Sequence, residues 1–149
     1  MSDPVLYMAS PYSCADCPEV EDLRFEAAAH AQAALFRRGQ VVYSPIAACH
    51  PVRRIASTPG DFAFWGKLNR AMIERCDSFG ILTLLGYGES AGIHGEVKVA
   101  RELGKPLSFI SWEGLVPVET INAIAKLFAE IRAKKDAGIQ RAIDAYNGK

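Results

Sequence analysis

The sequence lacks an excess of charge of either sign, because 17 Lys and Arg residues balance 17 Asp and Glu residues in 149 positions. A neutral chain offers no strongly basic surface to a nucleic-acid polymer or an anionic membrane, so neither partner is predicted. The sequence also lacks an apolar run long enough to span a bilayer. Its opening stretch, MSDPVLYMAS, has neither the basic residues nor the long apolar run of a signal peptide. We therefore expect a cytoplasmic protein.

Cysteine is sparse, with four residues at positions 14, 17, 49 and 76. This number does not indicate a disulfide framework in a domain of this size. Cys14 and Cys17 form a C-x-x-C pair, and a zinc site would need Cys49 and His50 as its other two ligands. Cys49 and His50 are adjacent, and adjacent side chains point apart in an extended chain, which argues against this site. A zinc site and a redox dithiol remain alternatives to the favoured interpretation, ordinary reduced cysteines. No metal or organic cofactor is predicted.

Apolar runs and helical patterns alternate along the chain. Strands are predicted at residues 5–9, 40–46, 77–85 and 106–110, and residues 47–60 are predicted as a long irregular loop. Helical spacing of apolar residues predicts four helices, over residues 23–38, from Thr58-Pro59, from Ile93 to Gly104, and from Pro117. In the second helix, the residues expected to face inward are Phe64, Leu68, Ala71 and Met72. The last helix is expected to break near Gly138. This alternation is typical of one doubly wound domain over residues 1–149. We expect a three-layer α/β/α sandwich, flavodoxin-like or Rossmann-like, with a parallel sheet of four or five strands.

Polar and glycine residues gather in three stretches that follow predicted strands, namely residues 10–18, 44–58 and 86–92. The carboxyl ends of parallel strands meet at one edge of the sheet, where ligands bind in such folds. The last stretch, GYGESAG, leads from a strand into a helix, a setting in which backbone N–H groups bind phosphate. It matches neither the P-loop nor the G-x-G-x-x-G pattern, so by itself it is a weak signal.

Glu96 lies just past this turn, in the second turn of the predicted helix. A glutamate there is usually solvated and is favoured by the helix dipole. Glu96 nevertheless shares a helix face with Ile93, Val97 and Ala100, which places it near the buried side. A buried carboxylate close to an anion-binding loop is suited to act as a nucleophile or an electrostatic partner.

Four stretches, YMASPYS, VVYSPI, CDSFGIL and ESAGIHGEVKVARELGKP, together resemble the nucleoside 2-deoxyribosyltransferase superfamily. This superfamily includes the transferases and the nucleoside 5′-monophosphate N-glycosidases. The matching order spans residues 5 to 110 and is most similar to the uncharacterised bacterial and phage branch with SPYS and SPI..H, the DUF1937-like domains. The resemblance implies a small nucleotide or nucleoside as substrate, no cofactor, and a homodimer or larger homo-oligomer.

The resemblance also assigns catalytic roles. Glu96 would attack C1′ of the sugar, and the departing base would leave a glycosyl-enzyme that water or a second base resolves. Tyr7 would orient the carboxylate. Asn69 stands where better-known members have an aspartate that contacts base or sugar, so the proton for the base would come from His50, from water or from Asp61. Asp77 matches a strand aspartate whose role, catalytic or structural, stays open.

Ser90 favours a phosphate within this family. The monophosphate hydrolases have a serine at this place, whereas the transferases have an aspartate that would repel a phosphate. The predicted substrate and phosphate contacts are Ser10, Arg24, His50, Gly88, Ser90 and Gly92, with Arg53 and Arg54 as further cations. Ser90 would also serve as a helix N-cap, which is compatible with phosphate binding.

The leading hypothesis is therefore an N-glycosidase acting on a nucleoside 5′-monophosphate. A deoxyribosyltransferase that exchanges bases is the alternative within enzymes. A nucleotide-binding module without catalysis is the alternative outside them, favoured by Asn69 and opposed by Glu96.

Overall fold

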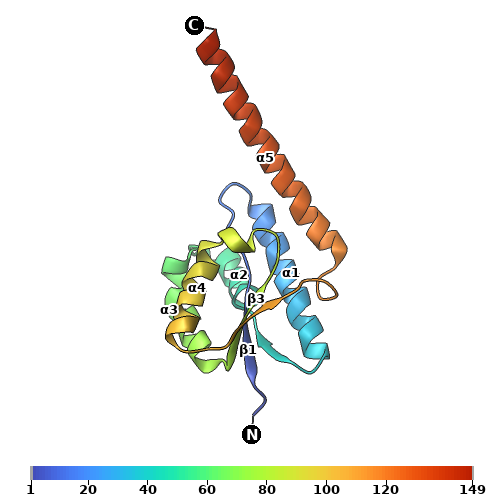
Figure 1. The fold of residues 1–149 in the computed structure, drawn as a ribbon, viewed down its shortest axis with the longest axis vertical. Helices are drawn as coiled ribbons and strands as arrows, with labels where there is room; N and C mark the ends of the chain where they lie inside the picture. The colour runs from blue at the N-terminus through green and yellow to red at the C-terminus, as the bar shows by residue number, and fades with distance from the viewer. Residues whose placement is uncertain (1, 149) are drawn as a thin grey trace.

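The computed structural model describes residues 2–148 and contains one parallel sheet of four strands in the order β2-β1-β3-β4. The strands are β1 (Val5–Ala9), β2 (Val41–Tyr43), β3 (Ser78–Leu82) and β4 (Leu107–Ile110). The helices are α1 (Pro18–Arg37), α2 (Pro45–Ala56), α3 (Phe62–Arg75), α4 (Ala91–Glu102) and α5 (Val118–Asn147). Helices α3 and α4 cover one face of the sheet, α1 covers the other, and the start of α5 packs on α1 (Figure 1). The predicted α/β/α class is confirmed.

Alternating side chains of β1 divide the core into two halves. Met8 points toward α1 and packs with Ala27, Ala31 and Leu82. Tyr7 and Ala9 point the other way, into a second cluster with residues of α3 and α4. Because successive strand residues face opposite sides of the sheet, the position of Tyr7 three residues into β1 turns its ring toward α4.

The stretch between β2 and α3 differs from the prediction of a long loop. Residues 45–56 form α2, and β2 ends at Tyr43. Ser44 caps this helix by accepting a hydrogen bond from Ala47 N at 3.1 Å, and Pro45 sits in the first turn, where no backbone N–H is needed. Pro51 lies inside the helix and removes one backbone donor. The loop prediction was wrong because Pro45 favours the start of a helix and Pro51 does not end it.

Helix α3 also buries a different face from the predicted one. Phe64 and Leu68 are exposed, at 49% and 41% of their surface, while Asn69 and Ile73 are buried. The helix begins at Phe62 and not at Thr58-Pro59, because Asp61 Oδ1 caps it by accepting from Phe64 N at 2.9 Å. A polar Asn69 therefore occupies the centre of the buried face.

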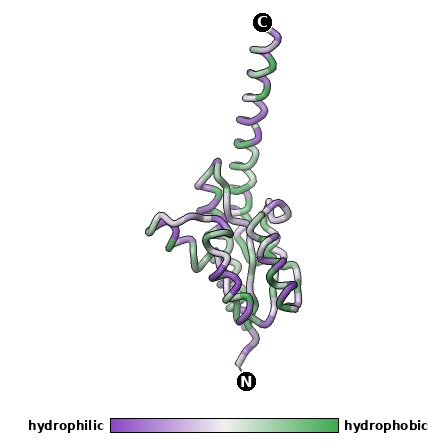
Figure 2. Tube along the Cα trace, turned by 90° about the vertical axis from the view of Figure 1, so that its left-hand side faces the viewer, coloured by the Kyte–Doolittle hydropathy of each residue, from purple (hydrophilic) through white to green (hydrophobic). Residues whose placement is uncertain are grey.

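Helix α5 is continuous over 30 residues and does not break at Gly138. Its first turns bury Thr120 and Ile124 against the body. Its second half projects beyond the body and alternates apolar and polar positions (Figures 1 and 2). Within residues 2–148, no helix is both long enough and apolar enough to cross a membrane.

Candidate active site

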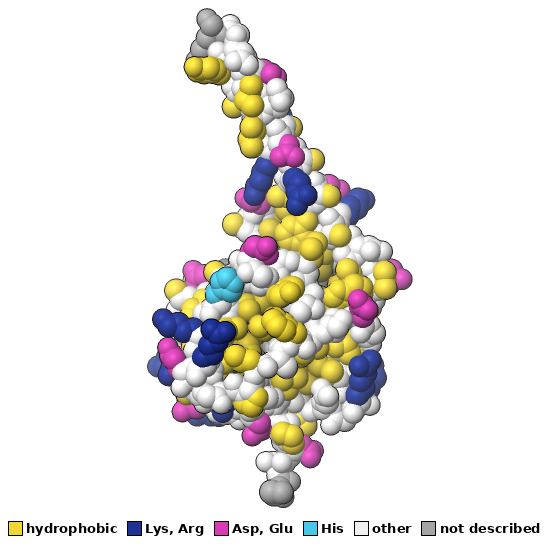
Figure 3. Space-filling view, viewed as in Figure 1, with side chains coloured by type: hydrophobic (Ala, Val, Ile, Leu, Met, Phe, Trp, Pro, Cys, Tyr) yellow, Lys and Arg dark blue, Asp and Glu magenta, His cyan; other side chains and the backbone are white. Residues whose placement is uncertain are grey.

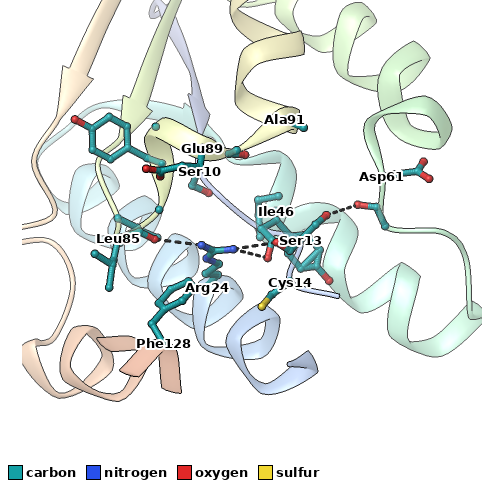
Figure 4. Close-up of a pocket in the computed structure, with 18 of the residues that line it drawn as sticks. Ser10, Ser13, Cys14, Arg24, Ile46, Asp61, Leu85, Glu89, Ala91 and Phe128 are labelled. Carbon is teal, nitrogen blue, oxygen red and sulfur yellow. Dashed lines mark hydrogen bonds between the residues drawn. The ribbon is translucent and has the colours of Figure 1, made fainter. Parts of the chain in front are cut away.

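A cavity of about 1420 Å³ lies at the carboxyl ends of the strands, where the three polar stretches were expected to meet. The loops after β1 and β3, the first turns of α2, α3 and α4, and one side of α5 line it. Figure 4 shows Ser10, Ser13 and Arg24 on one side of this space and Ala91, at the start of α4, on another. The structure thus has a cavity at the edge of the sheet where the sequence predicts the site.

Glu96 is buried in the wall of this cavity, with 5% of its surface exposed. Its Oε1 accepts a hydrogen bond from Asn69 Nδ2 at 3.3 Å, and its Oε2 has no partner. Burial raises the pKa of Glu96 to about 8, and the nearby Tyr7 hydroxyl opposes this rise. In the free protein at neutral pH, the carboxyl group is therefore mostly protonated.

Tyr7 is wholly buried and stacks on Phe79 of β3, with ring centroids 5.3 Å apart. Burial, together with Glu96, raises the pKa of Tyr7 well above 10, so its hydroxyl keeps its proton. No hydrogen bond of ordinary geometry reaches this hydroxyl, although it lies close enough to Glu96 to lower the pKa of that carboxyl. The Tyr7 hydroxyl is therefore a donor placed close to the Glu96 carboxyl.

Tyr7, Asn69 and Glu96, which we call the Glu96 triad, together hold three buried polar atoms without a partner: Tyr7 Oη, Asn69 Oδ1 and Glu96 Oε2. Folded proteins leave few such atoms, because each costs about 1–3 kcal/mol. Their concentration beside one cavity indicates a place where a polar ligand completes the hydrogen bonding.

Gly95 brings α3 close to α4 at the triad. A Cβ at this position would lie 3.0 Å from the ring of Phe62. The glycine before Glu96 therefore lets the start of α3 pack on α4 and places Asn69 beside the carboxylate. This role of Gly95 was not predicted, although Gly95-Glu96 lies in the stretch ESAGIHGEVKVARELGKP, because it depends on a contact with Phe62 of another helix.

Arg24 projects from α1 into the same edge of the sheet and is 5% exposed. Its guanidinium donates to the carbonyls of Tyr12 and Ser13, at 3.0 and 3.2 Å, and to that of Leu85 at 3.2 Å. It lies over the ring of Phe128, and its Nε has no partner (Figure 4). No ion pair joins it to a carboxylate within residues 2–148. A buried cation without a counter-ion favours an anionic ligand.

The glycine-rich loop after β3 approaches Arg24. Gly86 has φ +91°, and a Cβ there would lie 2.6 Å from Arg24 Nη2, so only glycine fits. Ser90 Oγ caps α4 by accepting from Ile93 N at 3.3 Å. Gly88 is exposed, and its carbonyl accepts a hydrogen bond from His94 Nε2 at 2.8 Å. The cap at Ser90 is confirmed, and its role toward phosphate stays a prediction, as do those of Gly88 and Gly92.

His50 lies on α2, buried in the cavity wall, and not in the expected loop. Its Nδ1 faces Tyr12 Oη at 2.5 Å and its Nε2 faces Asp22 Oδ1 at 3.1 Å. Burial, with Arg54, lowers the pKa of His50, which favours the neutral ring, and a neutral ring that donates to Asp22 can accept from Tyr12. Both nitrogens are occupied, and the proposed transfer of a proton from His50 to the base has no support in this arrangement.

Asp77 is not brought to the site. It precedes β3 at the amino-terminal edge of the sheet, and its Oδ2 accepts a hydrogen bond from Val5 N at 2.7 Å. Glu96 and the cavity lie at the opposite edge. The structure thus favours the structural role of Asp77 over the catalytic one, because the carboxylate fixes the start of β1 beside β3.

Arg53 and Arg54 are tied to other groups. Arg53 forms an ion pair with buried Glu21 and covers the ring of Tyr12, and Arg54 pairs with Asp22 at 2.9 Å.

The cysteines are free thiols: Cys17 donates to Glu19 at 3.1 Å, and Cys49 lines the cavity. In the part of the chain that the structure describes, no three His, Cys, Asp or Glu side chains are grouped as metal ligands.

Comparison with protein-family models gives a match. The model of a family described as a domain of unknown function, DUF1937, matches residues 4–112, which include all four strands and helices α1 to α4. No curated protein matches the chain. All residues of the Glu96 triad lie inside the matched region, and α5 lies outside it.

Proposed function

The chain belongs to the DUF1937 family, and because the description of that family assigns no function, we propose one from the site: the protein is an N-glycosidase that cleaves the base–sugar bond of a nucleoside 5′-monophosphate. The observation that carries this proposal is the buried Glu96 carboxyl in the cavity wall, with one oxygen unpaired and a tyrosine hydroxyl beside it. The resemblance of the sequence motifs to the nucleoside 2-deoxyribosyltransferase superfamily suggests the reaction type. The buried cation Arg24 suggests that the substrate is an anion.

The proposed reaction begins when Glu96 loses its proton to solvent and the carboxylate attacks C1′ of the sugar. The C1′–N bond breaks, its electron pair leaves with the base, and water supplies the proton that the base takes up. The transition state resembles an oxocarbenium ion, and its positive charge favours the ionised form of a carboxyl whose pKa is otherwise about 8. A water molecule then attacks C1′ of the glycosyl-enzyme, releasing the sugar phosphate and restoring Glu96.

The phosphate is proposed to bind between Arg24, Ser10 and the start of α4. Arg24 Nε and Ser10 Oγ are both buried and unpaired. The amino end of α4 adds backbone N–H groups and the positive end of the helix dipole. The hydrogen bonds of Arg24 to three carbonyls fix its plane, so the charge is held in place before the substrate arrives.

The resemblance implies a homodimer or a larger homo-oligomer, and of these two we propose the homodimer. The projecting part of α5 exposes Ile139 by 62%, Ile143 by 46% and Tyr146 by 80%. Most of the stability of a helix in a protein comes from packing of its apolar face, and this part of α5 leaves that face uncovered. Apolar side chains also gather on the surface near the foot of α5 (Figure 3), and a second copy would cover both.

Chromatographic detection of free base tests the activity. The purified protein is incubated with each ribo- and deoxyribonucleoside 5′-monophosphate and with the corresponding nucleosides, beside Glu96→Gln and the control Glu74→Gln, which changes an exposed carboxylate on α3. We expect release from monophosphates by wild type and Glu74→Gln and none by Glu96→Gln.

The other outcomes distinguish the alternatives. Release from nucleosides, or base exchange when a second free base is added, would replace hydrolysis with the transferase reaction. Tight nucleotide binding without any release over long incubation would replace the enzyme with a binding module. Release that persists in Glu96→Gln would refute the assigned nucleophile.

A further inference from the structure

Asn69 has one half of its amide engaged and the other half free. Nδ2 donates to Glu96 Oε1 at 3.3 Å, whereas Oδ1 is buried and has no partner. This contact turns the donor side of the amide toward Glu96, and it is the only side that can face the ionised carboxylate of the reacting enzyme. The acceptor Oδ1 is thus held beside the proposed nucleophile, in a residue that lines the cavity.

We propose that Asn69 Oδ1 accepts a hydrogen bond from the 2′-hydroxyl of the sugar, so that the site selects ribonucleotides over 2′-deoxyribonucleotides. The inference rests on the proposed function, because it assumes that Glu96 lies against C1′. It differs from the preference for deoxy sugars that the name of the transferase superfamily implies.

The position of the hydroxyl follows from the covalent structure of the sugar. C2′ is bonded to C1′, so its substituent lies next to the atom that Glu96 attacks. A group hydrogen-bonded to the attacking carboxylate is therefore within reach of the 2′-oxygen. Hydrogen bonds to this hydroxyl strengthen as positive charge develops on the sugar, which makes the contact useful in the transition state as well as in binding.

A deoxy sugar would leave Oδ1 without a partner. The C2′ methylene has no donor, and water cannot take its place once the sugar fills the site. A site built to pair a hydroxyl discriminates strongly against the analogue that lacks it, because a buried polar group then stays unpaired. Deoxyribosyl bonds are intrinsically easier to break, so the decisive quantity is the change in preference between variants and not the wild-type preference alone.

The test compares kcat/KM for base release from matched ribo- and deoxyribonucleoside 5′-monophosphates in wild type, Asn69→Ala and Asn69→Asp. We expect Asn69→Ala to lower the ribo-to-deoxy ratio roughly 10-fold or more. Asn69→Asp keeps an acceptor but loses the donor to Glu96, so kcat should fall for both sugars while the ratio is retained. Lys67→Ala, on the exposed face of α3, is the control and should leave the ratio unchanged.

An unchanged ratio in Asn69→Ala would overturn the inference and leave the glycosidase standing, since Oδ1 would then face the 3′-hydroxyl or the base. If no nucleotide releases base, the proposed function fails and calorimetry decides the inference separately. Binding of ribose 5-phosphate roughly 10-fold tighter than 2-deoxyribose 5-phosphate, by wild type but not by Asn69→Ala, would support it. Equal affinity for the two sugars, or binding of neither, would overturn it.

Discussion

Replacing Glu96 by glutamine should stabilise the protein at alkaline pH while abolishing the proposed activity. The pKa of Glu96 is about 8 in the folded protein, against 4.5 for an ordinary glutamate. Between these two values, the unfolded chain has lost the proton that the folded protein still holds. Stability therefore falls as pH rises from 4.5 to 8, and the full effect is present above pH 8.

The magnitude follows from this difference in pKa, which corresponds to about 5 kcal/mol once the group is ionised in both states. Relaxation around the charge reduces this upper value, and we expect Glu96→Gln to exceed wild type by roughly 2–5 kcal/mol at pH 9. Glutamine cannot ionise, and its amide can donate to Asn69 Oδ1, which is otherwise unpaired.

Urea unfolding followed by circular dichroism from pH 5 to pH 9 measures this effect. The stability advantage of Glu96→Gln should be small at pH 5 and should grow with pH, whereas Glu74→Gln should show no such growth. An advantage that stays constant with pH, or a variant less stable than wild type at pH 9, would refute the argument that Glu96 is buried as an acid.

Three further predictions concern the reaction, the loop after β3 and the assembly. If ionised Glu96 is the nucleophile, kcat/KM for base release should rise with pH and level off above about pH 8, and a decrease over this range would instead indicate that Glu96 acts as an acid. Gly86→Ala forces a side chain into left-handed backbone and against Arg24, so it should lower stability by about 1 kcal/mol or more and weaken monophosphate binding measured by calorimetry. Gly88→Ala has open space at its Cβ and should leave the unfolding midpoint unchanged. Ile139→Asp should convert the proposed dimer into a monomer in analytical ultracentrifugation, and a wild type that sediments as a monomer would exclude the dimer.

The sequence predicted the parts of the fold that depend on local periodicity. Strand β1 coincides with the predicted strand 5–9, and α1 ends at Arg37, one residue before the predicted end of the helical spacing. The burial of Glu96 also followed from its helix face. The branch of DUF1937 domains named from the motifs is confirmed by the family match, whereas the link to the wider superfamily stays a prediction.

The errors concern features that depend on contacts between distant segments. The buried face of α3 is set by its packing on α4 at Gly95, and the apolar Phe64 and Leu68 gave a misleading helix face. The engagement of His50 by Tyr12 and Asp22 joins three segments, and no local pattern encodes it. The lack of a carboxylate partner for Arg24 could not be predicted either. Its hydrogen-bond partners are backbone carbonyls, which every residue carries, so only the folded chain shows which of them it reaches.

The strand order of the sheet also has a consequence for folding during synthesis on the ribosome. Strand β1 pairs with β2 on one side and with β3 on the other, and Tyr7 lies between Tyr43 and Phe79 in register. One edge of β1 must therefore stay unpaired until a segment some seventy residues later has been synthesised, and contacts of this separation form slowly. During that interval the nascent chain exposes an apolar strand edge, which is the form most prone to aggregate. Production yield should then depend on chaperones and growth temperature more than the stability of the finished fold would suggest.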